Sequence, residues 1–227
     1  MLPEKMTSLI ILPELKQQIR TNLGCFDYQV ANDEENRKAA VALTVVTYEN
    51  DGGVYGMATD GYVKENAALI LTRRNAGLNS HSGQWALPGG RMDSGETPEA
   101  TALRELEEEV GLQLDYEDIL GRLDDFVSRS GYIITPIVLW GGANRELIAN
   151  PAEVGAIHRI PINEFMREDA PILESVPELE NPVLLMPVGN SWIASPTGAI
   201  LYQFREVAIA GNDTRVAHYE QPYFAWS

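Results

Sequence analysis

Apolar residues recur along the chain at two different spacings, and the wider spacing predicts helices. Between residues 12 and 23 they occur every three or four positions, so this segment is expected to form a helix with one apolar face. The same spacing over residues 196–210 predicts a helix near the C-terminus, with Ser195 placed to cap its start and Gly211 to end it. A third helix is expected over residues 98–110.

Shorter apolar runs, rich in β-branched residues, predict the strands. They occupy residues 39–47, 67–72, 122–128, 132–140 and 154–160. Pro136, inside the fourth run, suggests a sheet edge or a bulge at that point. A short helical turn is expected over residues 163–167, and a proline-rich passage follows it. Strands mixed with helices in this way predict an α/β sandwich.

Two polar stretches interrupt this pattern and predict loops. Residues 50–66 hold several glycines and aspartates with little apolar content, so we expect an exposed hairpin or loop there. Residues 75–84 are expected to form a second polar loop, which leads into Trp85, an expected core residue. The C-terminal tail, from residue 218 onward, is rich in aromatic residues and is expected to pack back onto the protein.

Composition narrows the class of protein. The chain has 227 residues and a formal net charge of −16 at pH 7, so we expect one domain with additions and no nucleic-acid partner, because phosphate backbones are bound by basic patches. No apolar run approaches membrane-spanning length, so we expect a cytoplasmic protein without membrane contact. The lone Cys25 excludes an internal disulfide and is interpreted as a buried or inert thiol. The sequence leaves the oligomeric state open.

One expected helix carries an unusual concentration of carboxylates. It begins after Thr97, a good N-cap residue, and Gly111 is placed to end it. Glu105, Glu108 and Glu109 stand at positions i, i+3 and i+4, so they share a face although like charges at this spacing repel one another. A hard divalent cation such as Mg²⁺ would compensate for this repulsion, since it prefers oxygen ligands. The alternative is a solvated acidic surface.

The surrounding residues resemble the Nudix box, G-x5-E-x7-R-E-U-x-E-E-x-G-U, in which U is a bulky aliphatic residue. Its fixed positions are filled at the right spacing by Gly90, Glu96, Arg104, Glu105, Leu106, Glu108, Glu109, Gly111 and Leu112. Such a match would arise by chance in roughly one chain of this size in 10⁷, which favours the cation site. The resemblance implies a single Nudix hydrolase domain over residues 1–227, an α/β/α sandwich with a mixed central sheet. Its core would span residues 37–167, between an N-terminal helix and a C-terminal helical extension over residues 168–227.

The resemblance also implies roles for individual residues. Glu105, Glu108 and Glu109 would bind Mg²⁺ or Mn²⁺, with the backbone carbonyl of Gly89 as a further ligand. The group that takes the proton from the attacking water is left open between Glu105, Glu109 and Glu153, the last of which lies in a later loop.

A structural pair completes the implied site. Arg104 and Glu96 would form an ion pair that ties the loop of the box to its helix.

The residues just before the box resemble the motif of the coenzyme A pyrophosphatase subfamily, L-L-T-x-R-[SA]-x3-R-x3-G-x3-F-P-G-G. The matching positions are Leu71, Thr72, Arg74, Gly83, Pro88, Gly89 and Gly90. Asn75, Asn79 and Leu87 depart from the motif. Asn79 is the departure that matters most, because it replaces an arginine and offers neither the charge nor the bidentate fork that arginine presents to phosphate.

This second resemblance implies a small-molecule substrate. Coenzyme A or an acyl-CoA would be cleaved to 3′,5′-ADP and (acyl-)4′-phosphopantetheine. Arg73, Arg74, Asn79 and Arg91 are then the candidate substrate contacts, with Arg73 or Arg91 compensating for the missing arginine. Three alternatives stay open: ADP-ribose or another nucleoside diphosphate derivative as substrate, a nucleotide-binding module without turnover, and a purely structural role for Arg73 and Arg74 at a strand end.

Overall fold

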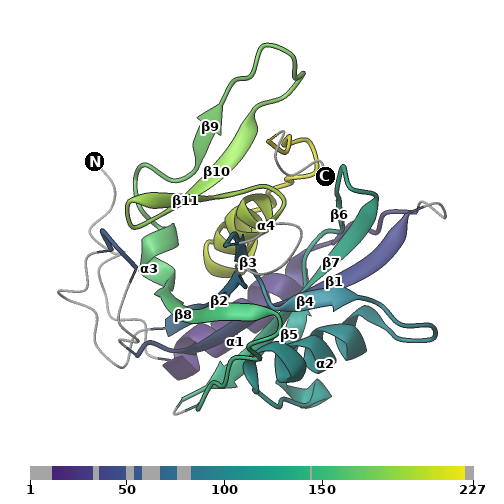
Figure 1. Cartoon of the computed structure of the whole chain (residues 1–227), viewed down its shortest axis with the longest axis vertical. Coiled ribbons are helices and arrows are strands. Elements are labelled where there is room, and N and C mark those ends of the chain that lie inside the picture. Colours follow the sequence, from purple (N-terminus) through teal and green to yellow (C-terminus); the bar gives the residue numbers. More distant parts are fainter. Residues whose placement is uncertain are drawn as a thin grey trace.

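The computed structural model describes residues 12–32, 36–49, 54–57, 67–75, 83–143 and 145–222. Within these ranges the chain forms a large mixed sheet with helices on both faces and a smaller sheet near the C-terminal end (Figure 1). The helical segments are α1 (Leu12–Cys25), α2 (Pro98–Val110), the 3₁₀ turn η2 (Tyr116–Asp118), α3 (Ile162–Phe165), α4 (Thr197–Gln203) and the π-helical turn η3 (Phe204–Ile209). No helix among the described residues is both long and apolar enough to cross a membrane.

The large sheet is built around two long parallel strands. Its strands are β1 (Arg37–Thr47), β2 (Ala67–Arg74), β3 (Trp85–Ala86), β4 (Gly89–Arg91), β5 (Ile119–Arg122), β6 (Phe126–Val127), β7 (Tyr132–Gly142) and β8 (Val154–Pro161). The main path runs β3-β2-β1-β7-β5, while β4 pairs with β1, β6 with β7 and β8 with β2. Only β1 and β7 run parallel among the strand pairs that the described residues form, so the sheet is mixed.

Both faces of the sheet are buried, which explains why its strands are nearly continuous apolar runs. Along β1, Ala40 and Ala42 belong to the core cluster under α2, whereas Leu43 and Val45 belong to the cluster that α1, α4 and η3 cover. This alternation follows the two-residue period of a strand. The arrangement is an α/β/α sandwich, as predicted (Figure 1).

Several predicted elements are confirmed with small shifts at their ends. The predicted helices over residues 12–23 and 98–110 are α1 and α2, and the strand runs at 39–47, 67–72, 132–140 and 154–160 are β1, β2, β7 and β8. The turn expected over residues 163–167 is the short helix α3. Trp85 lies in the core, as expected.

The prediction of one continuous strand over residues 122–128 is wrong. This segment is split into β5 and β6, and Leu123 to Asp125 between them leave the ladder because both aspartate carboxylates turn inward and accept hydrogen bonds from distant segments. The break faces Pro136 of β7, whose carbonyl accepts from the Leu123 backbone N–H at 3.1 Å. β7 is an inner strand, since it lies between β1 on one side and β5 and β6 on the other. The missing N–H of Pro136 therefore lies beside the break between β5 and β6, and not at the edge of the sheet.

The C-terminal region differs most from the prediction. Ser195 does not cap the last helix: its buried hydroxyl donates instead to the Leu184 carbonyl at 3.1 Å, and α4 begins without a side-chain cap. The proline-rich passage conceals a three-stranded antiparallel sheet, in the order β11-β10-β9. Its strands are β9 (Ile172–Glu174), β10 (Val183–Val188) and β11 (Ser191–Ala194).

Two further expectations have different outcomes. Cys25 is exposed, so the buried alternative for this thiol is wrong; it ends α1 on the solvent side. Of the loop expected over residues 50–66, residues 50–53 and 58–66 lie outside the described residues, and residues 54–57 form a turn.

Asp124 joins the C-terminal extension to the core. Its buried carboxylate accepts hydrogen bonds from the Gln29 backbone N–H at 2.7 Å, from Gln203 Nε2 at 2.7 Å and from Arg215 Nη1 at 2.8 Å. Because the buried carboxylate accepts three hydrogen bonds that a neutral amide cannot reproduce, Asp124→Asn is expected to lower the free energy of unfolding by about 1.5–3 kcal/mol.

Urea unfolding followed by circular dichroism measures this loss. Asp213 supplies the matched control, since it pairs with the same arginine but its side chain is 76% exposed. Asp213→Asn should change stability by no more than about 0.5 kcal/mol. Equal effects of the two substitutions would show that the Asp124 network does not hold the extension in place.

Candidate active site

The carboxylate-bearing helix is set in place by local sequence signals at both ends. At the start of α2, Thr97 Oγ1 accepts from the Ala100 backbone N–H at 3.2 Å. At its end, Gly111 adopts a left-handed conformation with φ of 69° and donates to the Glu107 carbonyl. Glycine suits this conformation because it has no Cβ to clash. The apolar face of α2 packs on the sheet, so the side chain of Glu109 is buried against it.

Arg104 is the hub of the polar side of α2. Its Nε and Nη2 donate to the two oxygens of Glu96, at 2.8 and 3.0 Å, which gives the bidentate ion pair that the box predicts. Its Nη1 donates to Glu105 at 2.8 Å and to Glu108 at 3.1 Å. The hydrogen bonds from Arg104 are the main reason that the pKa of Glu96 falls to about 2. Arg104 also donates to the Arg91 carbonyl at 3.2 Å, so it fastens the box loop to the helix.

Glu105 and Glu109 are held against two glycines of β4. A Cβ on Gly90 would lie 2.3 Å from Glu105 Oε1, so the Glu105 carboxylate occupies the space that any side chain at position 90 would need. Burial raises the pKa of Glu105. Burial also raises the pKa of Glu109 to about 7, although a hydrogen bond from the Gly89 backbone and the nearby charge of Arg74 oppose the shift.

The structure brings Glu153 to the same place. The negative charge of Glu153 contributes to the raised pKa of both Glu105 and Glu109. Its segment is tied to the end of β2 by Asn75, whose backbone N–H donates to the Glu153 carbonyl at 2.8 Å and whose Nδ2 donates to the Pro151 carbonyl. Asn75, one of the departures from the subfamily motif, thus positions the loop that carries a candidate catalytic glutamate.

The donor set suits a hard divalent cation, although the carboxylates do not surround a common point in this arrangement. Among the described residues, no three acidic, histidine or cysteine side chains are close enough together to hold a metal ion. Glu105 and Glu108 both accept a hydrogen bond from Arg104 Nη1 in this arrangement. Glu109, however, is a buried carboxylate with a raised pKa, and a bound cation would favour its charged form. Carboxylate oxygens and a backbone carbonyl are also the ligands that Mg²⁺ prefers.

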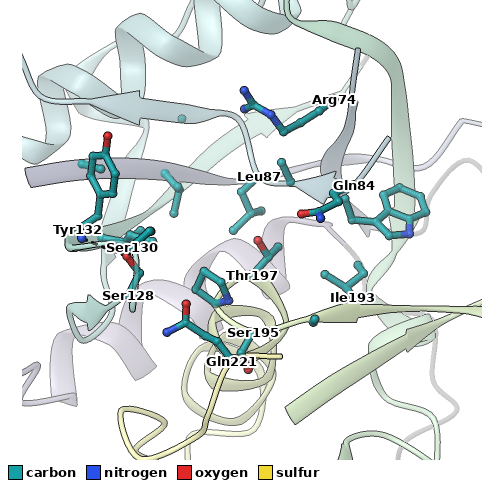
Figure 2. A pocket seen from close by; sticks show the side chains of 18 of the residues that line it. Arg74, Gln84, Leu87, Ser128, Ser130, Tyr132, Ile193, Ser195, Thr197 and Gln221 are labelled. Atoms are coloured by element: carbon teal, nitrogen blue, oxygen red, sulfur yellow. Dashed lines mark hydrogen bonds between the residues drawn. The ribbon is translucent and has the colours of Figure 1, made fainter. Parts of the chain in front are cut away.

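A cavity of about 660 Å³ adjoins this cluster. Gly89 and Gly90 line it on the side of the box, and Arg74 projects over it from the end of β2 (Figure 2). The Nε atom of Arg74 is buried and makes no hydrogen bond within the part of the chain that the structure describes. A buried donor without a partner is costly, so Arg74 is suited to bind an anion that enters the cavity.

The other predicted substrate contacts are placed differently. Arg73 stacks on the Trp85 ring at 3.7 Å and donates to the Gly83 carbonyl at 2.9 Å, so it helps to build the cavity wall. Arg91 is exposed at the rim of the cavity. Asn79 lies outside the described residues.

Much of the cavity comes from residues that sequence reasoning did not single out. One end is formed by Ser128, Ser130 and Tyr132, and the wall opposite Arg74 is formed by residues 191–197 together with Gln221 (Figure 2). These segments carry no motif. The packing of the C-terminal extension onto the sheet brings residues 191–197 and Gln221 to the box, and the pairing of β7 with β1 brings Tyr132.

Comparisons with known proteins agree with the box. A model of the NUDIX domain matches residues 55–178. The chain is 39% identical over 134 residues to the uncharacterized Nudix hydrolase NudL of Photorhabdus laumondii, covering 59% of this chain and 63% of that protein. It is 40% identical over 164 residues to Nudix hydrolase 3 of Caenorhabditis elegans, covering 68% of this chain and 62% of that protein. The chain thus spans about three-fifths of the length of these curated relatives.

Among solved structures, a MutT/nudix family protein from Enterococcus faecalis superposes with a TM-score of 0.45 at 18% identity, covering 72% of this chain and 52% of that chain. The match to the family model extends over more than half of the sequence and includes the whole box. On these grounds the chain is a member of the Nudix family.

Proposed function

We propose that this protein is a Mg²⁺- or Mn²⁺-dependent pyrophosphohydrolase that cleaves the diphosphate of coenzyme A or an acyl-CoA to 3′,5′-ADP and (acyl-)4′-phosphopantetheine. One observation carries the proposal. Gly89 and Gly90 contact the buried glutamates of α2 and also line the cavity, so a diphosphate in the cavity lies next to the carboxylates with only bare backbone between.

Each group near the cavity has a part in this proposal. Glu105, Glu108, Glu109 and the Gly89 carbonyl would hold the metal. When bound, the metal polarises a phosphate oxygen and lowers the pKa of a coordinated water. Arg104 keeps Glu105 in place through the 2.8 Å hydrogen bond from its Nη1.

Substrate binding and proton transfer depend on further side chains. Arg74 would bind the diphosphate through its unpartnered Nε and the rest of its guanidinium. The proton acceptor is one of Glu105, Glu109 and Glu153, which lie close together: the charge of Glu153 helps to raise the pKa of both Glu105 and Glu109, and the charge of Glu105 helps to raise that of Glu109. Replacing each of the three by Gln and comparing pH–rate profiles distinguishes the acceptor from the others, because only its loss should remove the rise in rate with pH that follows from deprotonation of the base.

Coenzyme A is the proposed substrate for two reasons. The subfamily motif places its arginine at position 74, and Arg74 projects into the cavity (Figure 2). The cavity is also largely apolar beyond the arginines, which suits a long arm better than a second sugar. Because the extension over residues 168–227 supplies one wall, we treat it and the core over residues 37–167 as one catalytic domain.

A substrate panel tests the proposal. Coenzyme A, dephospho-coenzyme A and ADP-ribose are incubated with Mg²⁺ or Mn²⁺, and the products are identified by mass. We expect coenzyme A to give the highest kcat/KM and chelation to abolish turnover, with restoration by either cation. ADP-ribose cleaved far better than both coenzymes would replace coenzyme A as the substrate, and binding without turnover would show a non-catalytic module.

The substitution Asn79→Arg tests the departure from the subfamily motif. A hydrogen bond to a charged group contributes about 1.5–3 kcal/mol, so a restored arginine that reaches phosphate is expected to lower KM for coenzyme A by roughly tenfold or more. If the contact is with the 3′-phosphate, dephospho-coenzyme A should gain much less. An unchanged KM for both coenzymes would remove position 79 from the phosphate contacts.

A further inference from the structure

The C-terminal extension forms a complete wall of the cavity. Residues 191–197 run along it as β11, the turn after it and the start of α4, with Gln221 beside them. Figure 2 shows Thr197, Ser195 and Gln221 on the side of the cavity opposite Arg74. This wall is fixed to the rest of the protein by a hydrogen bond and by burial of a side chain. The Ser195 hydroxyl is bonded to the Leu184 carbonyl, and Ile193 is buried in the core.

Charge is distributed unevenly around the cavity. Its charged lining residues, among those the structure describes, are Arg73, Arg74 and Arg91, and all of them come from β2 and β4 on the side of the box. The C-terminal wall contributes only neutral side chains, in a chain whose net charge is −16. An anionic group is therefore stabilised at the box end alone, because an ionised group against the neutral wall would lose its hydration without compensation.

The wall also distinguishes between uncharged groups. Ile193, Ala194 and Pro196 offer apolar surface. Of the polar side chains in the same wall, Ser195 already donates to the Leu184 carbonyl and Gln221 accepts from the Arg129 backbone N–H, while Ser191 and Thr197 add hydroxyls. A sugar would leave several hydroxyl groups without partners against such a surface, at a cost for each. An aliphatic chain with a few amides would bury its methylene groups and need few polar partners. A cavity of about 660 Å³ is within the range that encloses ligands of this size.

We propose that residues 191–197 form a specificity subsite for an uncharged, extended, amide-containing aliphatic arm attached to the diphosphate, with the pantetheine arm as its occupant. The inference rests on the proposed function, because the arm is placed by a diphosphate held at Arg74 and the box. It goes beyond that function in assigning the C-terminal extension, rather than the box or the upstream motif, as the element that selects the group beyond the diphosphate.

Direct binding of the two halves of coenzyme A tests the subsite without requiring turnover. Calorimetry with Mg²⁺ measures the Kd of 4′-phosphopantetheine and of 3′,5′-ADP for the full chain, in wild type and in Thr197→Trp. The added indole should fill the space along the wall. We expect it to weaken binding of 4′-phosphopantetheine by at least about tenfold and binding of 3′,5′-ADP by less than about threefold.

Two other variants complete the design. Leu173→Trp introduces the same ring at an exposed position of β9, in the same small sheet but away from the cavity, and should change neither Kd. Ala194→Leu is a smaller intrusion into the same wall. If circular dichroism shows that Thr197→Trp is unfolded, Ala194→Leu should still weaken 4′-phosphopantetheine selectively, by at least about threefold.

The remaining outcomes overturn the subsite. Equal weakening of both ligands, weakening of 3′,5′-ADP alone, no change in either, or no binding of 4′-phosphopantetheine to the wild type would each do so. Failure of the proposed function has a different signature. A wild type that hydrolyses none of the diphosphates in the panel, yet shows the selective loss in Thr197→Trp, would keep the subsite and remove the catalytic proposal.

Discussion

Replacing Glu109 with Gln is expected to reduce metal-dependent turnover by at least about a hundredfold while the protein stays folded. The substitution keeps the size of the side chain and its helix propensity but removes one charge from the cluster. Glu109 is 5% exposed, and the Gly89 backbone of the cavity wall donates a hydrogen bond to it. Because the carboxylate is shielded from water, no water-exposed group can take its place. The measurement is kcat/KM with Mg²⁺ for the best substrate of the panel.

The same variant should be more stable than wild type when metal is absent. Burial raises the pKa of Glu109 from 4.5 to about 7. Between these values the unfolded chain has released the proton and the folded protein still holds it, so stability falls as pH rises through this window. The loss should amount to about 3 kcal/mol by pH 8, and Glu109→Gln should lack it. Added Mg²⁺ should stabilise the wild type far more than the variant.

Glu107→Gln is the matched control for both readouts. Glu107 lies on the same helix, but it is exposed and occupies a variable position of the box. Its replacement should change kcat/KM by less than about twofold, in keeping with the small effects of exposed charges. Wild-type turnover in Glu109→Gln would remove this residue from the metal site, and parallel pH–stability curves for the variant and wild type would contradict its desolvation.

Gly90→Ala should be nearly as damaging to activity, for a steric reason. The new Cβ would lie 2.3 Å from Glu105 Oε1, so the carboxylate must move. A displacement of about 1 Å in a catalytic group can cost about a hundredfold in rate, and we expect kcat to fall by that order. The chain should still fold, because the group that must give way is the end of a flexible side chain rather than backbone.

Two further variants test whether Gly90→Ala lowers kcat by displacing the Glu105 carboxylate. Gly24→Ala adds a methyl group where nothing lies within 4 Å, and it should leave turnover unchanged. If Gly90 acts by displacing Glu105, the double variant with Glu105→Gln should be no worse than Glu105→Gln alone. Additive losses, or normal kcat in Gly90→Ala, would show that the position of Glu105 does not depend on this glycine.

Most of the large sheet could be read from the sequence, and the errors have identifiable causes. β1, β2 and β7 were predictable because burial on both faces makes each of them a nearly continuous apolar run, whereas β8 is buried mainly in its second half. The single strand predicted over residues 122–128 failed because Asp124 and Asp125 bond to partners more than ninety residues away. No local pattern reveals such partners.

The small C-terminal sheet was missed for a related reason. Proline suppresses the strand signal of residues 183–188, yet Pro187 sits within β10, paired with Trp192 of β11. Ser195 has the residue type and position of a helix cap, but a buried carbonyl from β10 competes for its hydroxyl. In both cases a tertiary contact outweighed a local preference.

The sequence by itself determined α2 and its carboxylates. The Thr97 cap, the left-handed Gly111 and the i, i+3, i+4 glutamates depend only on residues within one helix, and so does the reach of Arg104 to Glu108. Only the tertiary structure decided how those carboxylates behave and what lies beside them. The raised pKa of Glu109 arises from burial by the sheet and β4, and the cavity wall at residues 191–197 meets the box through contacts between segments about a hundred residues apart. Desolvation and cavity shape are properties of the packed molecule, because each depends on every segment that excludes water from the same place.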